Sequence, residues 1–230
     1  MPAPIKFSDA PHKSRRFGRL LDPIIFASNL AIAAWVYPAW RTARVRWEPD
    51  SGPLVELLER HEGPMICFGW HAYELLMFCA FRGFPRQDMP MAVGHDGFLS
   101  RALQQSGTWY GFPIWAYRRH STIRPRQQLI ELLAGTRQTI GLFTDAGGPD
   151  ERVKPGIIEI ARETGAQLLP IAVHAKPVFR FPGPRRYLFP LPFARMVAHY
   201  AEPLDGRHCT LEECQHALDL LEDRIAQERV

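Results

Sequence analysis

The sequence has few cysteines, and their spacing excludes the usual cysteine-based metal site. Four cysteines occur among the 230 residues, and no two of them are separated by only two residues. Zinc sites built on cysteine commonly use such close pairs, so a zinc site of that kind is not expected. Cys67 and Cys79 lie in apolar runs. We therefore interpret the thiols as reduced, as in a protein of a reducing compartment.

One long segment of the sequence, residues 23–40, contains no charged side chain. As a helix this segment would be about 27 Å long. A bilayer core is about 30 Å thick and requires about 20 mostly apolar residues, so the length is borderline for a membrane span. Trp35, Tyr37 and Trp40 lie toward its C-terminal end, and arginines follow. Because these aromatic residues favour the headgroup level and arginine favours anionic lipid, we predict a helix that lies in or dips into one leaflet. A buried helix of the folded domain and a signal segment are the alternatives.

Acidic residues are few in the same part of the chain. Residues 1–47 contain eight lysines and arginines but only Asp9 and Asp22, whereas the whole chain has a formal net charge of +4. A basic end on a near-neutral body indicates an anionic surface as partner. Nucleic acid is not expected, because the basic residues flank an apolar segment and do not interleave with a groove-binding motif. We therefore interpret residues 1–47 as a basic arm and a membrane-associating segment, with membrane lipids as the partner.

The chain also lacks internal repeats and low-complexity tracts. Its 46% hydrophobic and 23% charged residues are ordinary globular values, and residues 48–230 suit a single domain with a full core. Many of the 21 prolines fall between Pro170 and Pro203. Because proline interrupts helices, extended connections are predicted there.

Apolar runs that suit strands alternate with segments of helical periodicity. Short apolar runs predict strands at 64–70, 89–94, 112–117, 139–144 and 168–173. Helical spacing predicts helices at 53–61, 75–81, 99–103, 125–133, 157–161 and 211–228. Such alternation is typical of an α/β domain whose central, mostly parallel sheet is flanked by helices.

The first four predicted strands all end in polar residues that could do chemistry. In chain order these endings are His71 with Glu74, then His95-Asp96-Gly97, then Arg118-Arg119-His120, then Asp145-Ala146-Gly147-Gly148. The carboxyl ends of parallel strands lie at one edge of the sheet, and ligands of open α/β sheets bind there. We therefore expect the four blocks to converge.

The residue types in these blocks suit one kind of reaction. A histidine beside a carboxylate can act as a general base. An arginine loop can bind phosphate bidentately, and a glycine-rich turn lets backbone amides approach an anion closely. The combination predicts acyl transfer to or from a phosphate-bearing substrate, with His71 at the centre.

The four blocks, in this order, resemble those of the lysophospholipid (glycerolipid) acyltransferase superfamily, and most of all its bacterial branch of lysophospholipid-acyltransferase-like proteins. They are Phe68-Gly69-Trp70-His71, Gly94-His95-Asp96-Gly97-Phe98-Leu99, Tyr117-Arg118-Arg119-His120-Ser121, and Thr144-Asp145-Ala146-Gly147-Gly148-Pro149 with the later Lys154-Pro155-Gly156. Two further pieces, Leu191-Pro192-Phe193-Ala194-Arg195 and Glu202-Pro203-Leu204, resemble C-terminal features of that branch. The resemblance covers about residues 45–205.

The resemblance implies that a fatty acyl group passes from an acyl thioester to a hydroxyl of a (lyso)phospholipid or glycolipid acceptor at the membrane surface. The thioester is acyl-CoA or acyl carrier protein, used as a co-substrate. In that scheme His71 is the catalytic base, and either Glu74 or Asp96 is the carboxylate that orients it. No metal ion and no tightly bound cofactor is implied.

The substrate-binding residues also follow from the resemblance. Arg118 and Arg119 are expected to bind the anionic group of the acceptor. The backbone at Gly147 and Gly148 is expected to contact the substrate, and Asp145 to shape that turn. The protein is expected at the cytoplasmic side of the membrane, as a peripheral or monotopic protein.

One departure from the superfamily keeps other hypotheses open. In the superfamily, four residues separate the histidine from an aspartate. Leu76 occupies the position of that aspartate in this chain. A catalytically inactive, membrane-peripheral lipid-binding protein on the same fold is therefore the alternative function. A third hypothesis is a metal hydrolase that uses His71, His95, Asp96 and Asp145, because mixed histidine and carboxylate ligands suit a first-row metal.

Overall fold

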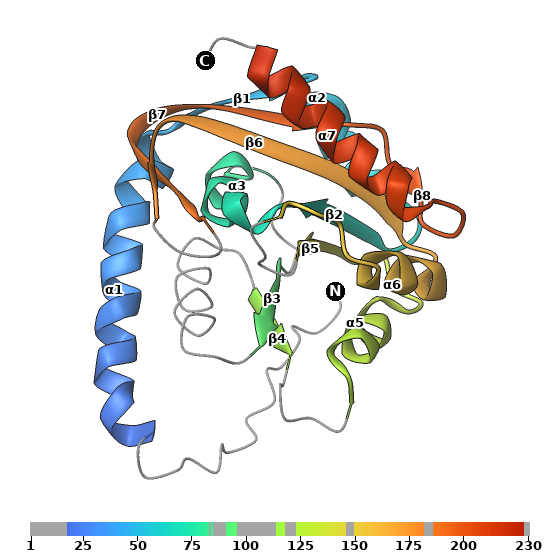
Figure 1. Ribbon diagram of the computed structural model, residues 1–230, viewed down its shortest axis with the longest axis horizontal. Coiled ribbons are helices and arrows are strands. Elements are labelled where there is room, and N and C mark those ends of the chain that lie inside the picture. The colour runs from blue at the N-terminus through green and yellow to red at the C-terminus, as the bar shows by residue number, and fades with distance from the viewer. Residues whose placement is uncertain are drawn as a thin grey trace.

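The backbone is organised around one mixed sheet. The computed structural model describes residues 18–82, 84, 91–95, 114–117, 123–145, 150–181 and 186–227. Eight strands of these residues form the sheet in the order β1-β7-β6-β2-β5-β3-β4, with β8 paired to β6 (Figure 1). The strands are β1 (Arg44–Glu48), β2 (Met65–Gly69), β3 (Met91–His95), β4 (Ile114–Tyr117), β5 (Thr139–Phe143), β6 (Gln167–Arg180), β7 (Leu188–Tyr200) and β8 (Leu204–Asp205).

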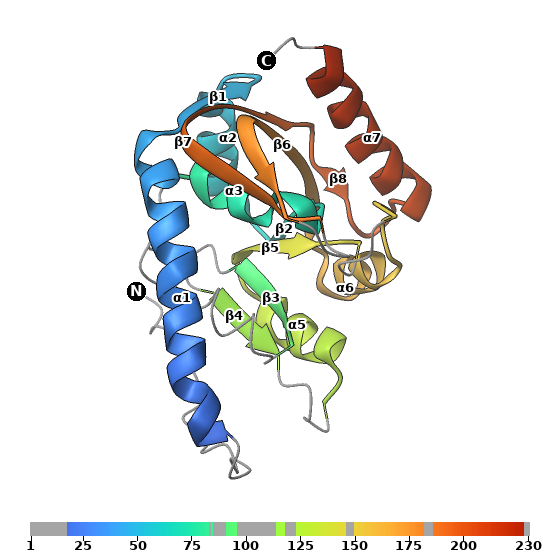
Figure 2. The same ribbon diagram turned by 60° about the vertical axis from the view of Figure 1, so that its left-hand side comes forward.

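Helices cover the sheet on both sides. They are α1 (Gly18–Thr42), α2 (Ser51–Arg60), the short 3-10 turn η1 (His71–Tyr73), α3 (Glu74–Ala80), α5 (Pro125–Leu133), α6 (Gly156–Thr164) and α7 (Leu211–Gln227). Helix α1 packs along β7, whereas α3 and α7 pack on β6 and β7 from opposite sides (Figures 1 and 2). Helices α5 and α6 pack on each other.

The predicted parallel core is confirmed. Strand β2 runs parallel to both of its neighbours, β5 and β6, and β3 runs parallel to β5 and β4. All five residues of β2 are buried. A parallel strand that is covered on both faces appears in the sequence as a continuous apolar run, which is why this strand was recognisable.

The proline-rich part of the chain forms strands where connecting segments were predicted. Residues 168–173 were predicted as a strand and the following prolines as extended connections, but β6 continues to Arg180 and pairs antiparallel with β7. The pairing shifts register between Lys176 and Val178. Proline removes a donor from the ladder without preventing an extended backbone, so Pro170, Pro177, Pro190 and Pro192 lie within the two long strands.

Helix α1 is longer than the uncharged segment and passes through Pro23 and Pro38. Val36 and Ala39 are buried, whereas Trp35 and Tyr37 are about half exposed. Within the part of the chain that the structure describes, no helix combines the length and apolar character that a membrane span requires. Contact of α1 with one leaflet stays a prediction.

We predict that Gly69, the last residue of β2, tolerates no side chain. An ideal Cβ there would lie 2.6 Å from the backbone oxygen of Ile171 and 3.2 Å from the Met77 side chain. Because that oxygen belongs to the neighbouring strand, Gly69→Ala should lower the free energy of unfolding by about 1–3 kcal/mol. The measurement is urea denaturation.

Gly63→Ala is the matched control, because an added Cβ there has no heavy atom within 4 Å. Its free energy of unfolding should stay within about 0.5 kcal/mol of the wild-type value. Equal stability of the two variants would contradict the close packing of β2 against β6.

Candidate active site

The register of two strands brings His71 to Asp145. Strands β2 and β5 are neighbours, and Gly69 lies opposite Phe143. The ladder continues one step further, because the backbone N–H of Thr144 donates to the carbonyl oxygen of Gly69 at 3.0 Å. His71 and Asp145 each lie two residues beyond the Gly69–Phe143 pair that ends the two strands, so they are side by side at the carboxyl edge.

His71 and Asp145 form a hydrogen-bonded pair. Nδ1 of the His71 ring contacts Oδ1 of Asp145, and the backbone N–H of His71 also donates to Oδ1 at 3.4 Å. The side chain of Asp145 is only 3% exposed, whereas that of His71 is 13% exposed. The carboxylate is thus enclosed, and the imidazole remains accessible from the surface.

The pair determines which ring nitrogen of His71 is available for chemistry. An ionised carboxylate only accepts hydrogen bonds, so neutral His71 donates from Nδ1 to Asp145. Its Nε2 then carries the lone pair and can accept a proton. The ring of Phe143 lies 5.2 Å from the His71 ring, centroid to centroid, and restricts its orientation from one side.

The segment that follows β5 is held at both ends. The backbone N–H of Lys154 donates to the carbonyl oxygen of Thr144 at 2.9 Å. Just before Lys154 in the chain, the N–H of Val153 donates to the side-chain oxygen of Gln215 on α7 at 2.9 Å. The Gln215 amide in turn donates to the backbone oxygen of Glu151. These bonds fix the chain on either side of the predicted glycine turn.

Helix α7 also contacts the turn that carries His71. The hydroxyl of Tyr73, the last residue of η1, donates to Oε1 of Glu222 at 2.5 Å. Burial and the Glu222 carboxylate raise the pKa of Tyr73. The phenol therefore stays protonated and remains a hydrogen-bond donor, so Glu222 anchors the turn two residues from the catalytic candidate.

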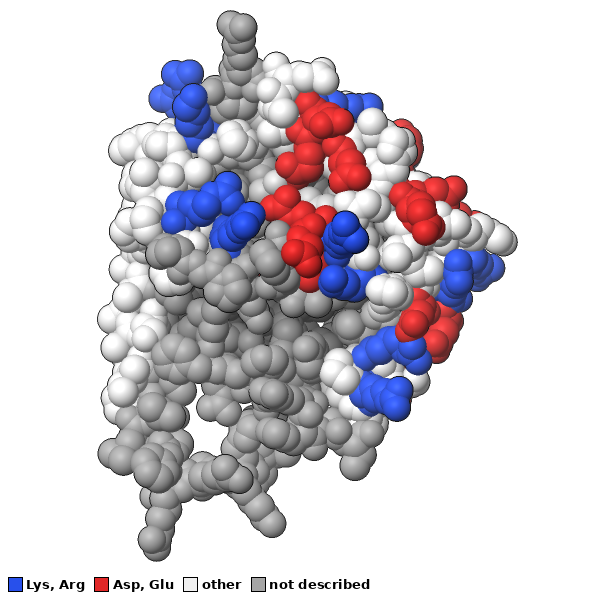
Figure 3. All heavy atoms as spheres, viewed as in Figure 1, with Lys and Arg blue, Asp and Glu red and all other residues white. Residues whose placement is uncertain are grey.

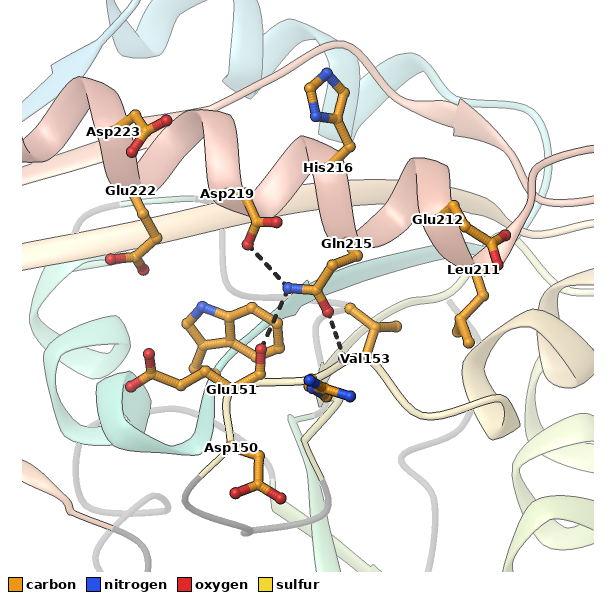
Figure 4. A pocket seen from close by; sticks show the side chains of 12 residues that line it. Asp150, Glu151, Val153, Leu211, Glu212, Gln215, His216, Asp219, Glu222 and Asp223 are labelled. Carbon is orange, nitrogen blue, oxygen red and sulfur yellow. Dashed lines mark hydrogen bonds between the residues drawn. The ribbon is translucent and has the colours of Figure 1, made fainter.

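A pocket of about 810 Å³ lies between α7 and the segment that follows β5. Figure 4 shows Glu151 on that segment opposite Asp219 and Glu222 on α7. Its lining is strongly acidic, with Asp150, Glu151, Glu212, Asp219, Glu222 and Asp223 beside Trp70, Arg152, Val153, Leu211, Gln215 and His216. The pocket thus reaches Trp70, the neighbour of His71.

The carboxylate observed beside His71 differs from the two that the sequence favours. Glu74 or Asp96 is predicted behind His71, whereas the carboxylate at Nδ1 of His71 belongs to Asp145. Glu74 is buried at the first residue of α3. Strand β3, which leads to Asp96, is separated from β2 by β5. Asp96 itself lies outside the described residues.

The other site residues keep the status of predictions. Arg118, Arg119, Gly147 and Gly148 lie outside the residues that the structure describes. The strands that precede the four blocks, β2, β5, β3 and β4, are mutually parallel and adjacent in that order, so their carboxyl ends lie at one edge of the sheet. His71 and Asp145 meet there, and convergence of the other two blocks stays a prediction. In the acyltransferase scheme Asp145 is predicted to shape the substrate turn and not to orient His71, because the order of the strands in space is not readable from the sequence. No pattern in the sequence indicates the contact between Tyr73 and Glu222.

These features define an α/β protein with a mostly parallel sheet and a His–Asp pair at the carboxyl edge of that sheet. Its fold is similar to that of an acyltransferase of known structure. The crystal structure of the 1-acyl-sn-glycerophosphate (LPA) acyltransferase PlsC from Thermotoga maritima matches with a TM-score of 0.50 and 17% sequence identity, over 93% of this chain and 89% of that chain. This likeness confirms the α/β fold. No family model and no curated protein sequence matches the chain. Membership of the bacterial branch stays a prediction.

We predict that Glu222 makes stability depend on pH. Burial raises the pKa of its carboxyl above the ordinary 4.5, the nearby Glu151, Asp219 and Asp223 raise it further, and the Tyr73 hydroxyl opposes the shift. Because the folded state holds this proton more tightly, the stabilisation is complete below about pH 4.5 and is lost as the pH rises through the raised pKa.

Glu222→Gln should remove this dependence, since the amide stays neutral and still accepts from Tyr73. Thermal unfolding of both proteins from pH 4.5 to neutral should show the wild type losing stability relative to the variant. Glu212→Gln, an exposed change on the same helix, is the control and should follow the wild type. Parallel wild-type and Glu222→Gln profiles would contradict the prediction.

Proposed function

We propose that the protein is an acyltransferase that moves a fatty acyl group from a thioester to a hydroxyl of a (lyso)phospholipid or glycolipid acceptor. The observation that carries this proposal is the His71–Asp145 pair at the carboxyl edge of the sheet. The pair supplies a base with an orienting acid, and the fold is shared with an acyltransferase. The ordered blocks of the sequence support the same reaction.

In this mechanism His71 Nε2 takes the proton of the acceptor hydroxyl as the oxygen attacks the thioester carbonyl. Asp145 holds the imidazole in the reactive tautomer and stabilises the imidazolium that forms. Collapse of the tetrahedral intermediate breaks the carbon–sulfur bond, and the proton passes from His71 to the leaving thiolate. The products are the acylated acceptor and a free thiol.

A covalent intermediate on a neighbouring cysteine has little support from the site. Cys67 lies in β2 and Cys79 lies in α3, and both are buried. Burial raises the pKa of each thiol to about 12. Because the thiolate is the nucleophile, these cysteines are inert at neutral pH. Direct transfer to the acceptor, with His71 as base, is the simpler scheme.

The remaining roles in the proposal follow the sequence blocks. Arg118 and Arg119 bind the anionic group of the acceptor, and the turn at Gly147 and Gly148 contacts the substrate. Acyl-CoA or acyl carrier protein serves as donor, and the reaction needs no metal or other cofactor. The protein works at the cytoplasmic side of the membrane, where its acceptor lies.

We predict that His71→Ala abolishes release of thiol from an acyl thioester in the presence of lysophospholipid. Asp145→Asn should reduce the rate by about 10²–10⁴-fold, because an amide at that position favours the wrong tautomer of the histidine. The rate is read from free thiol, and the acylated lipid is identified by mass spectrometry. Melting temperatures check that both variants are folded.

A second His–Asp pair provides the matched control. His208 and Asp205 form a hydrogen bond of 2.8 Å in an exposed turn after β8, outside the pocket. His208→Ala should leave thiol release at the wild-type rate. Full turnover by folded His71→Ala would refute the mechanism. A wild-type protein that binds lipid without releasing thiol would instead favour the lipid-binding alternative.

A further inference from the structure

Large apolar side chains are exposed mainly along one edge of the molecule. Among the described residues, nine large hydrophobic side chains are exposed, and seven of them lie on α1 and on the hairpin formed by β6 and β7. We call these seven the aromatic edge: Ile24, Leu30, Trp35, Tyr37, Phe179, Phe181 and Phe193. The sequence analysis assigned membrane contact to the first of these segments only, so the hairpin is an unexpected member.

Ring contacts join the helix and the hairpin into one surface. Phe179 lies opposite Phe189 in the ladder, and Trp35 of α1 lies 6.2 Å from the first ring and 6.4 Å from the second. Phe181 is on the same face of the strand as Phe179, because side chains alternate. Its ring lies 5.8 Å from that of Phe189. The exposed rings therefore share a fixed arrangement.

Both the exposure of Phe193 and its backbone conformation are unfavourable. It is 70% exposed, and its φ of 64° lies in the left-handed region that branched and bulky residues avoid. Its backbone N–H donates to the hydroxyl of Thr42, at the end of α1, at 2.8 Å. A strained, exposed phenylalanine that is tied to α1 points to a functional contact at this edge.

Positive charge predominates beside the aromatic edge in the sequence. Helix α1 contains one acidic residue, Asp22, whereas residues 23–47 and residues 167–200 contain arginines and no aspartate or glutamate. Arg41, Arg180 and Arg195 are exposed. In Figure 3 the carboxylates gather over α7, whereas the edge formed by α1 is almost free of them. An apolar surface with a cationic border is complementary to an anionic bilayer.

We propose that α1 and the β6–β7 hairpin together form a two-part contact with the surface of an anionic bilayer, with the hairpin phenylalanines inserted beside the helix. This inference rests on the proposed function, since it locates the membrane that supplies the acceptor. A second copy of the chain fits less well. A two-fold contact would place the same arginines against each other, and like charges disfavour that arrangement.

The test uses sedimentation of the full chain with phosphatidylcholine vesicles, with and without phosphatidylglycerol. The wild type should bind the anionic vesicles more tightly, and salt should weaken this binding. Phe181→Ser combined with Phe193→Ser should reduce partitioning by about tenfold for each inserted ring. The control is Ile123→Ser combined with Leu220→Ser, which should bind as the wild type does. Among the residues that the structure describes, these are the two exposed large hydrophobic side chains outside the aromatic edge.

A charge variant keeps the proposal testable if the serine variant fails to fold. Arg180→Glu combined with Arg195→Glu should lose the preference for anionic vesicles while its melting temperature stays close to the wild-type value. Wild-type binding by either folded variant would overturn the proposal. A dimer that the serine changes dissociate, with vesicle binding unaffected, would also overturn it and assign the edge to a second copy.

Failure of the proposed function would look different. Folded His71→Ala should bind vesicles like the wild type, and the serine variant should still release thiol with a water-soluble, short-chain acceptor. Vesicle binding that depends on the hairpin, in a protein that transfers no acyl group, would refute the enzyme and leave the membrane contact standing. Normal turnover in a protein whose vesicle binding does not depend on the hairpin would refute the membrane contact and leave the proposed enzyme standing.

Discussion

The parallel pairing of β2 with β5 is the constraint on which the candidate site depends. Both strands run through the core, and their register places Gly69 opposite Phe143. Side chains along a strand alternate between faces, so a slip of one residue would move Asp145 away from His71. The contact between His71 and Asp145 is thus a consequence of sheet packing, because the two residues are far apart in the sequence.

The parts of the fold that could be predicted are those whose signal is local. Helix α5 spans Pro125 to Leu133 as expected, because proline starts it and a positive-φ glycine follows it. Strand β2 was recognisable as a buried apolar run. Strand β1 was not, since its burial is irregular and its exposed arginines suggested a membrane flank. Strand β7 was hidden by its prolines, which do not oppose an extended backbone.

The site was predicted only in part, for a similar reason. His71 and the convergence of strand ends followed from residue types and from parallel topology. The acid did not follow, because the choice among carboxylates depends on the order of strands in space. Asp96 comes next along the chain, yet β5 separates its strand from β2. Asp145 is distant in sequence but adjacent in the sheet, and only long-range pairing brings it to His71.

The contact between Asp145 and His71 helps to explain why position 76 can be a leucine. In the superfamily that the sequence resembles, four residues separate the histidine from the aspartate, and Leu76 occupies the position of that aspartate. Here that position is fully buried in the core beneath the sheet, where a carboxylate would need a partner to offset its desolvation. Leucine avoids this requirement, and the residue two positions beyond β5, Asp145, brings a carboxylate to His71. Leucine at position 76 therefore does not by itself indicate an inactive protein.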